Sequence, residues 1–180
     1  MTPRTLRITI GALVIVVGLL IIGAVTWVTQ AADGPKQPIE FMHTVHVQEN
    51  DIDCVFCHRN VETGAEATIP AVEQCMMCHQ VINNEHPKVR ENPIHEAEIA
   101  KLRAHWENRE PIDWVRVHVM PDHVRFVHAA HIKAGFDCAT CHGDVGSMER
   151  VKQVRSLNMG DCVACHRENN APTDCTICHR

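Results

Sequence analysis

Five copies of one short pattern carry most of the chemistry that this sequence offers. Each copy reads Cys-x-x-Cys-His, and together the copies use all ten cysteines. This spacing is the attachment signature of c-type haem, in which two thiols form thioethers to the porphyrin and the adjacent imidazole binds the iron. The predicted attachment pairs are Cys54 and Cys57, Cys75 and Cys78, Cys138 and Cys141, Cys162 and Cys165, and Cys175 and Cys178. The predicted proximal ligands are His58, His79, His142, His166 and His179. The sequence therefore predicts five covalently bound haem c groups.

Three other uses of cysteine compete with this interpretation. They are a thioredoxin-like redox pair, structural zinc sites and a set of disulfides. None of them needs a histidine directly after every second cysteine, whereas haem attachment does. Because every pair in the chain is followed by histidine, we prefer haem attachment.

The N-terminal segment predicts a membrane anchor. Arg4 and Arg7 precede an uncharged run of 21 residues from Ile8 to Val28, which as a helix spans about 31 Å and matches the hydrocarbon core of a bilayer. Trp27 lies at its outer end, and the two arginines orient the remainder outward by the positive-inside rule. The alternative is a cleaved signal peptide, but the apolar region of such a peptide is shorter, about 7–15 residues. The only candidate cleavage site, Gln30–Ala32, is weak, so we predict an uncleaved anchor.

The composition of the exported part indicates how it forms a core. Aromatic residues make up 4% of the chain and tyrosine is absent, so protein side chains alone would build a thin core. We expect the porphyrin faces to supply the missing apolar surface. The predicted fold is mostly loops and short α-helices wrapped around five haems, plus one N-terminal transmembrane helix, with little or no β-sheet. The net charge of −5 argues against nucleic-acid binding.

The motifs are arranged as two modules. Two motifs lie close together near the middle of the chain and three near its end, and a phrase Phe-x-His-x-x-His precedes each group, at Phe41–His46 and at Phe126–His131. We predict an anchor at 1–30, a dihaem module at 31–86, a linker at 87–122 and a trihaem module at 123–180. Within the linker, residues 97–107 predict a short helix with Ile99 and Leu102 on one side, and Pro87, Pro93, Pro111 and Pro121 are expected to break the rest into loops.

The two histidines of each phrase resemble those of the class III multihaem cytochromes. There the first histidine binds the haem of the next motif and the second binds a later haem. Carried over, the resemblance implies four distal ligand pairs: His43 with His58, His46 with His79, His128 with His142, and His131 with His166.

The haem on His179 lacks an evident distal ligand. The class III pattern places a histidine just before the preceding motif, where this chain has Asn158–Asp161. Three possibilities stay open: ligation by Met159, which would give a higher potential than a second histidine, ligation by His118 from the linker, or an open coordination site. The four remaining histidines are not expected to be ligands: His86, His95, His105 and His123. Of these, His123 could lie near a haem propionate together with Arg116 and Arg125.

Longer stretches resemble the pentahaem cytochrome c subunit of alternative complex III, and are similar to the multihaem subunit of the related quinone reductase. The stretches are Pro111–His131, Cys141–Met148 and Leu157–Cys162, within a likeness that extends from residue 8 onward. The resemblance implies a single-pass protein of the bacterial inner membrane with its haem domain on the periplasmic side. Its implied partners are polytopic quinol-binding membrane subunits, a large iron–sulfur-type peripheral subunit, and a monohaem cytochrome c or another soluble electron acceptor.

The implied function is electron transfer from menaquinol, oxidised in a neighbouring subunit of a respiratory or photosynthetic complex, to a periplasmic carrier or an oxidase. The chain itself would not be catalytic, since one membrane helix is a poor quinol pocket. The alternative is a stand-alone membrane-anchored quinol dehydrogenase that feeds a periplasmic reductase. A catalytic multihaem reductase ranks last, because the sequence has no Cys-x-x-Cys-Lys motif.

Overall fold

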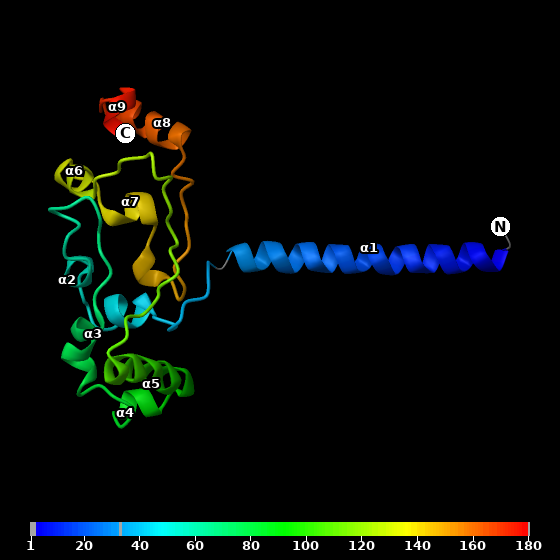
Figure 1. The fold of residues 1–180 in the computed structure, drawn as a ribbon, viewed down its shortest axis with the longest axis horizontal. Coiled ribbons are helices and arrows are strands. Elements are labelled where there is room, and N and C mark those ends of the chain that lie inside the picture. The colour runs from blue at the N-terminus through cyan, green and yellow to red at the C-terminus, as the bar shows by residue number, and fades with distance from the viewer. Residues whose placement is uncertain (1–2, 33, 180) are drawn as a thin grey trace.

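The fold is a row of short helices joined by long loops. The computed structural model describes residues 3–32 and 34–179, with side chains at 10–24 and 34–179. Its elements are α1 (Pro3–Ala32), η1 (Thr44–Gln48), α2 (Cys54–Cys57), α3 (Val72–His79), α4 (Pro87–Arg90), α5 (Pro93–Asn108), α6 (His128–Lys133), α7 (Cys138–His142), η2 (Val145–Ser147), α8 (Met159–Glu168) and α9 (Cys175–Cys178). Figure 1 shows the body as an elongated stack that runs from α4 and α5 at one end to α8 and α9 at the other. Within the described residues there is no β-strand, only an isolated bridge between Val124 and His179.

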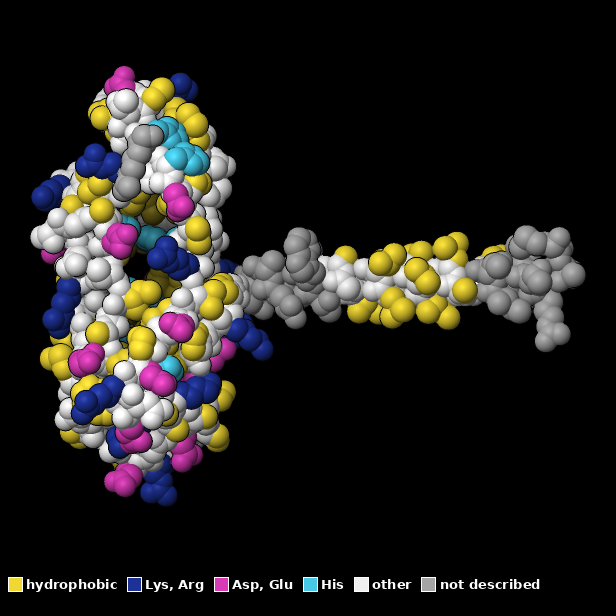
Figure 2. All heavy atoms as spheres, in the orientation of Figure 1, with side chains coloured by type: hydrophobic (Ala, Val, Ile, Leu, Met, Phe, Trp, Pro, Cys, Tyr) yellow, Lys and Arg dark blue, Asp and Glu magenta, His cyan; other side chains and the backbone are white. Residues whose placement is uncertain are grey.

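Helix α1 is 30 residues long and projects away from the body (Figure 1). Its described side chains are largely exposed, for example Leu13 at 63% and Leu20 at 67%, and Figure 2 shows them as an apolar sleeve around the helix. In a search confined to the described residues, no helix is long and apolar enough to cross a membrane. The side chains of Arg4, Arg7 and Trp27, on which the predicted anchor also depends, lie outside the described part of the chain.

Capping side chains explain where several of the body helices begin. Asp53 accepts a hydrogen bond from the backbone N–H of Val55 at 3.0 Å, and Asn158 accepts one from the backbone N–H of Asp161 at 2.9 Å. Such N-caps satisfy amide groups that the first helical turn leaves without partners. The caps of α2 and α8 therefore lie one and four residues before the first cysteine of a haem-attachment motif.

Two linker prolines start helices, which corrects the expectation that they would break the chain into loops. Pro87 and Pro93 are the first residues of α4 and α5, because proline at the first helical position lacks only an N–H that would be unpaired there anyway. Helix α5 covers the predicted helix over 97–107 and extends it in both directions. It presents Leu102, which is 6% exposed, to the body.

The protein core is small, as the low aromatic content predicts. Among the described residues, seven hydrophobic side chains are buried, and the most buried of them, Met76, is 2% exposed. One cluster of four buried residues lies between α3 and α5, with Ile112 and Trp114 of the linker packed against it. The cluster consists of Ile39, Val72, Met76 and Leu102. The linker therefore shares its core with the residues around the second haem motif.

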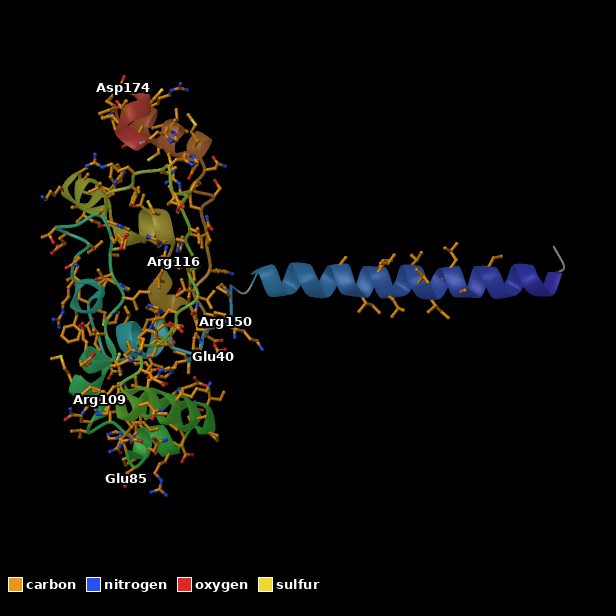
Figure 3. All side chains as sticks on the ribbon, in the orientation of Figure 1. Glu40, Glu85, Arg109, Arg116, Arg150 and Asp174 are labelled. Atoms are coloured by element: carbon orange, nitrogen blue, oxygen red, sulfur yellow. The ribbon has the colours of Figure 1, made fainter. Side chains whose placement is uncertain are left out.

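Long-range polar contacts attach the linker and the C-terminal segment to residues just after α1. The Gln37 side chain donates to the Val115 carbonyl and accepts from its N–H, both at 2.9 Å. Arg150 forms a salt bridge with Glu40 at 2.9 Å, and Figure 3 labels this pair where two distant segments of the chain meet. These contacts hold residues 37–40 against both halves of the body.

Candidate haem-binding sites

Each of the five attachment motifs forms or ends a short helix. Helix α7 coincides with its motif, α2 and α9 cover theirs as far as the second cysteine, and α3 and α8 contain theirs. Two cysteines three residues apart lie on one face of a helical turn, which places both thiols where a single porphyrin edge can reach them. None of the ten cysteines is in a disulfide. Among the described residues, no three His, Cys, Asp or Glu side chains converge as a metal site.

Three of the predicted proximal histidines are oriented by backbone carbonyls. The Nδ1 atom of His58 lies 2.6 Å from the Thr68 carbonyl oxygen. His79 has the same arrangement with Ile82 at 2.9 Å, and His166 with Pro172 at 2.5 Å. When Nδ1 carries the proton and donates it to a carbonyl, the lone pair of Nε2 is free. This is the tautomer that binds a metal through Nε2.

The two Phe-x-His-x-x-His phrases have nearly the same local structure. In the first, Phe41 stacks on His46 with ring centroids 4.3 Å apart at 24°. In the second, Phe126 stacks on His131 at 4.5 Å and 24°. In both, the second histidine places Nδ1 2.9 Å from the carbonyl four residues earlier. The repeat in the sequence is therefore a repeat in three dimensions, and its phenylalanine fixes the plane of the second imidazole.

Three predicted distal histidines face their predicted proximal partners. An imidazole nitrogen binds a transition metal at about 2.0 Å and its ring centroid lies about 1.1 Å further, so two imidazoles on one iron have centroids about 6.2 Å apart. The centroid separations are 6.1 Å for His46 and His79, 6.3 Å for His128 and His142, and 6.0 Å for His131 and His166. Each gap has the width that one haem iron needs, so these residues fit the cofactor.

Burial keeps two of the predicted ligand histidines, His43 and His142, uncharged. Burial, followed by the nearby His58 and His46, lowers the pKa of His43 to about 4. Burial also lowers the pKa of His142 to about 4, with contributions from His118, His128 and His58. Only the neutral imidazole binds iron, so the clustering favours the form required for ligation. His58 contributes to the lowered pKa of His43, as expected for the fourth predicted pair.

The structure separates His118, one of the candidate ligands for the haem on His179, from His179 itself. His118 does not meet His179; its ring lies 4.4 Å from that of His142, with Nε2 3.3 Å from the Nδ1 of His142. Met159 begins α8 with 68% of its surface exposed. His123, which the sequence analysis set aside, stacks on His179 with centroids 5.5 Å apart and planes within 18°. The linker passes His142 before it reaches His179, and this path was not evident from the sequence.

Contacts between motifs place them in a definite order along the body. The amide of Gln74 in α3 donates to the Phe56 carbonyl in α2 at 2.5 Å, and Cys57 raises the pKa of Cys75 beyond the effect of burial. At the other end, burial raises the pKa of Cys162, and Asp161 and the Cys178 thiol of α9 add to the rise. The second motif therefore adjoins the first, and the fourth adjoins the fifth.

The two modules meet at the first and third motifs. The backbone N–H groups of His128 and Ala129 donate to the carbonyls of Ala65 and Gly64 at 3.1 and 3.0 Å, and the Nδ1 of His128 lies 2.7 Å from the same Ala65 oxygen. Burial raises the pKa of Cys138, and the Cys54 thiol raises it further. Figure 1 shows the resulting succession α3, α2, α7, α8 and α9 along the body. Figure 2 shows histidine side chains in a hollow near its middle and again beside α9.

Two comparisons with known proteins agree with this geometry. Residues 124–180 match the family described as cytochrome c7 and related cytochrome c. The chain is also 28% identical over 171 residues to the multiheme cytochrome c subunit of menaquinone reductase from Nitratidesulfovibrio vulgaris, covering 81% of this chain and 77% of that protein. The chain has a helical multihaem cytochrome c fold, and its cofactor is covalently bound haem c.

Proposed function

We propose that this chain is a membrane-anchored pentahaem electron-transfer subunit of a menaquinol-linked complex. The observation that carries the proposal is the succession of the motif helices α3, α2, α7, α8 and α9 along the body (Figure 1), with hydrogen bonds that join α3 to α2 and the two modules to each other. Haem iron supplies one-electron chemistry, and the protein orders the sites so that an electron has a neighbour at every step.

The residues of this chain hold and tune the haems. We propose axial pairs of His43 with His58, His46 with His79, His128 with His142, and His131 with His166. The three measured ring separations support three of the pairs. The carbonyls that accept from proximal Nδ1 atoms raise the basicity of those ligands and favour the ferric state.

The predicted helix over Ile8–Val28 would anchor the chain in the bacterial inner membrane, with the haem body on the periplasmic side. Electrons would come from menaquinol oxidised in polytopic membrane subunits and leave for a monohaem cytochrome c, another soluble carrier or an oxidase. A large iron–sulfur-type peripheral subunit would complete the complex, as in alternative complex III. The relative's name, which includes menaquinone reductase, supports a quinone-linked complex.

The same name favours a second candidate, in which electrons flow through the chain towards menaquinone. The path through the protein would be identical and only the driving force reversed. Midpoint potentials of the five haems relative to the menaquinone couple distinguish the two directions.

The test is purification of the full chain from membranes of its native host, followed by haem counting and redox assay. We expect five haems per chain, co-purification of polytopic subunits, and haem reduction by a menaquinol analogue only in the assembled complex. A chain that is isolated alone and fully reduced by the analogue would show that the stand-alone quinol dehydrogenase is correct instead. Fewer than five haems would refute the pentahaem path.

A further inference from the structure

The geometry points to His123 as the sixth ligand of the haem on His179, which the sequence left without a distal partner. This inference rests on the proposed five-haem function and adds the identity of one ligand. It assigns a role to a histidine that the sequence pattern set aside, and it makes all five haems bis-histidine sites.

The backbone holds His123 beside the fifth motif. Val124 forms an antiparallel bridge with His179, and the N–H of Arg125 donates to the Cys178 carbonyl at 2.7 Å. A turn closed by the N–H of Val124 and the Pro121 carbonyl at 2.8 Å precedes this contact. His123 lies inside that turn, so its position relative to His179 is set by hydrogen bonds on both sides.

The rings themselves are arranged as a ligand pair would be. The centroids of His123 and His179 are 5.5 Å apart with planes 18° from parallel, and the near-parallel arrangement also occurs for His128 and His142 at 12°. The separation is about 0.7 Å shorter than the roughly 6.2 Å that two imidazoles on one iron require, and 0.5 Å shorter than the 6.0 Å of His131 and His166. Because the His123 side chain is exposed, it can rotate away from His179 by this amount while the backbone hydrogen bonds stay in place.

The two rival ligands are accounted for elsewhere. His118 has its Nε2 at 3.3 Å from the Nδ1 of His142, the position that backbone carbonyls occupy at three other proximal histidines. There it can accept the Nδ1–H of His142 and orient that ring, which is a positioning role. Met159 is the first residue of α8, and its side chain is 68% exposed.

The experiment compares His123→Ala with Met159→Leu and His118→Ala in the full-length protein with its haems attached. Loss of a sixth ligand leaves a ferric haem five-coordinate and high-spin, which low-temperature EPR detects. For His123→Ala we expect one of the five haems to become high-spin, and added imidazole to return it to low-spin. Met159→Leu and His118→Ala are expected to stay fully low-spin.

A second variant covers the case in which His123→Ala does not mature. His123→Met is expected to keep five low-spin haems, to gain the near-infrared band of methionine–haem charge transfer, and to raise the potential of one haem. That band in the unmodified protein, or a high-spin haem in Met159→Leu instead of His123→Ala, would overturn the assignment. Haem counting by pyridine haemochromogen distinguishes a wrong ligand assignment from a wrong five-haem proposal. A wrong assignment leaves five haems per chain, whereas a count below five would refute the pentahaem path.

Discussion

The cluster between α3 and α5 allows the role of the linker to be tested with one substitution. Leu102 is 6% exposed and packs in a group with Ile39, Val72 and Met76. A buried Leu→Ala change costs about 2–5 kcal/mol, and the cost falls when the surroundings can close the cavity. Because this cluster is small and bordered by half-buried side chains, we expect Leu102→Ala to cost about 2–3 kcal/mol.

The matched control is Ile94→Ala on the same helix. Ile94 is 59% exposed, so its truncation should change stability by no more than about 0.5 kcal/mol. Denaturation of both variants by guanidinium, followed by far-ultraviolet circular dichroism, gives the comparison. For a chain of this size the expected loss for Leu102→Ala corresponds to roughly 4–12 °C in Tm.

Equal stabilities of the two variants would refute the reasoning. Such a result would mean that α5 does not stabilise the helix that carries Cys75, Cys78 and His79. It would then have to be treated as a separate linker instead of a part of the dihaem core. A loss confined to the Leu102 variant would show that haem ligation alone does not hold this end of the body together.

Four further outcomes follow from the same structure. Replacing His46 with Met should leave five haems attached but raise the potential of one of them, since methionine favours the ferrous state; redox titration of the purified protein measures it, and an unchanged set of potentials would contradict the His46–His79 pair. On acidification, low-spin absorption of the haem proposed for His43 and His58 should persist below pH 6.5, because iron and the proton compete for the same imidazole nitrogen and burial already lowers the pKa of His43; an onset of high-spin absorption near 6.5 would contradict this. Gly34→Ala should destabilise the fold, because the backbone φ is +76° and an added Cβ would meet the Val151 carbonyl; a left-handed non-glycine residue costs about 1–3 kcal/mol, and thermal unfolding measures it. Asp53→Ala should cost about 1 kcal/mol through loss of the α2 N-cap, whereas Asp137→Ala, whose side chain makes no cap hydrogen bond, should cost less in the same assay.

Local signals were the ones that the sequence could reveal. The attachment motifs need only two cysteines one helical turn apart and a histidine next to them, so all their determinants lie within five residues. The Phe-x-His-x-x-His phrases are similarly short, and the stacking of Phe41 on His46 and of Phe126 on His131 shows why both were recognisable. The linker helix was predictable from Ile99 and Leu102, although the capping role of Asn92 and the helix-starting role of Pro93 extended it beyond its predicted start.

Contacts between distant residues were beyond the reach of spacing arguments. Nothing in the order of motifs along the chain indicates that the second would lie outside the first, or that the modules would join where His128 meets Ala65. The placement of His118 beside His142 and of His123 beside His179 depends on the path of an extended linker. That path is set by Gln37, Arg150 and the bridge at Val124, each paired with a residue more than fifty positions away.

The sequence by itself thus determined the kind of cofactor and predicted its attachment cysteines and proximal histidines, because these depend on covalent chemistry and on neighbours within one helical turn. The tertiary structure alone decided the spatial order of the motifs, the joint between the modules and which histidine lies beside His179. Those features depend on which residues the folded chain brings within a few ångströms of one another. Short helices joined by long loops permit many such arrangements, and only the packing of the whole body selects one.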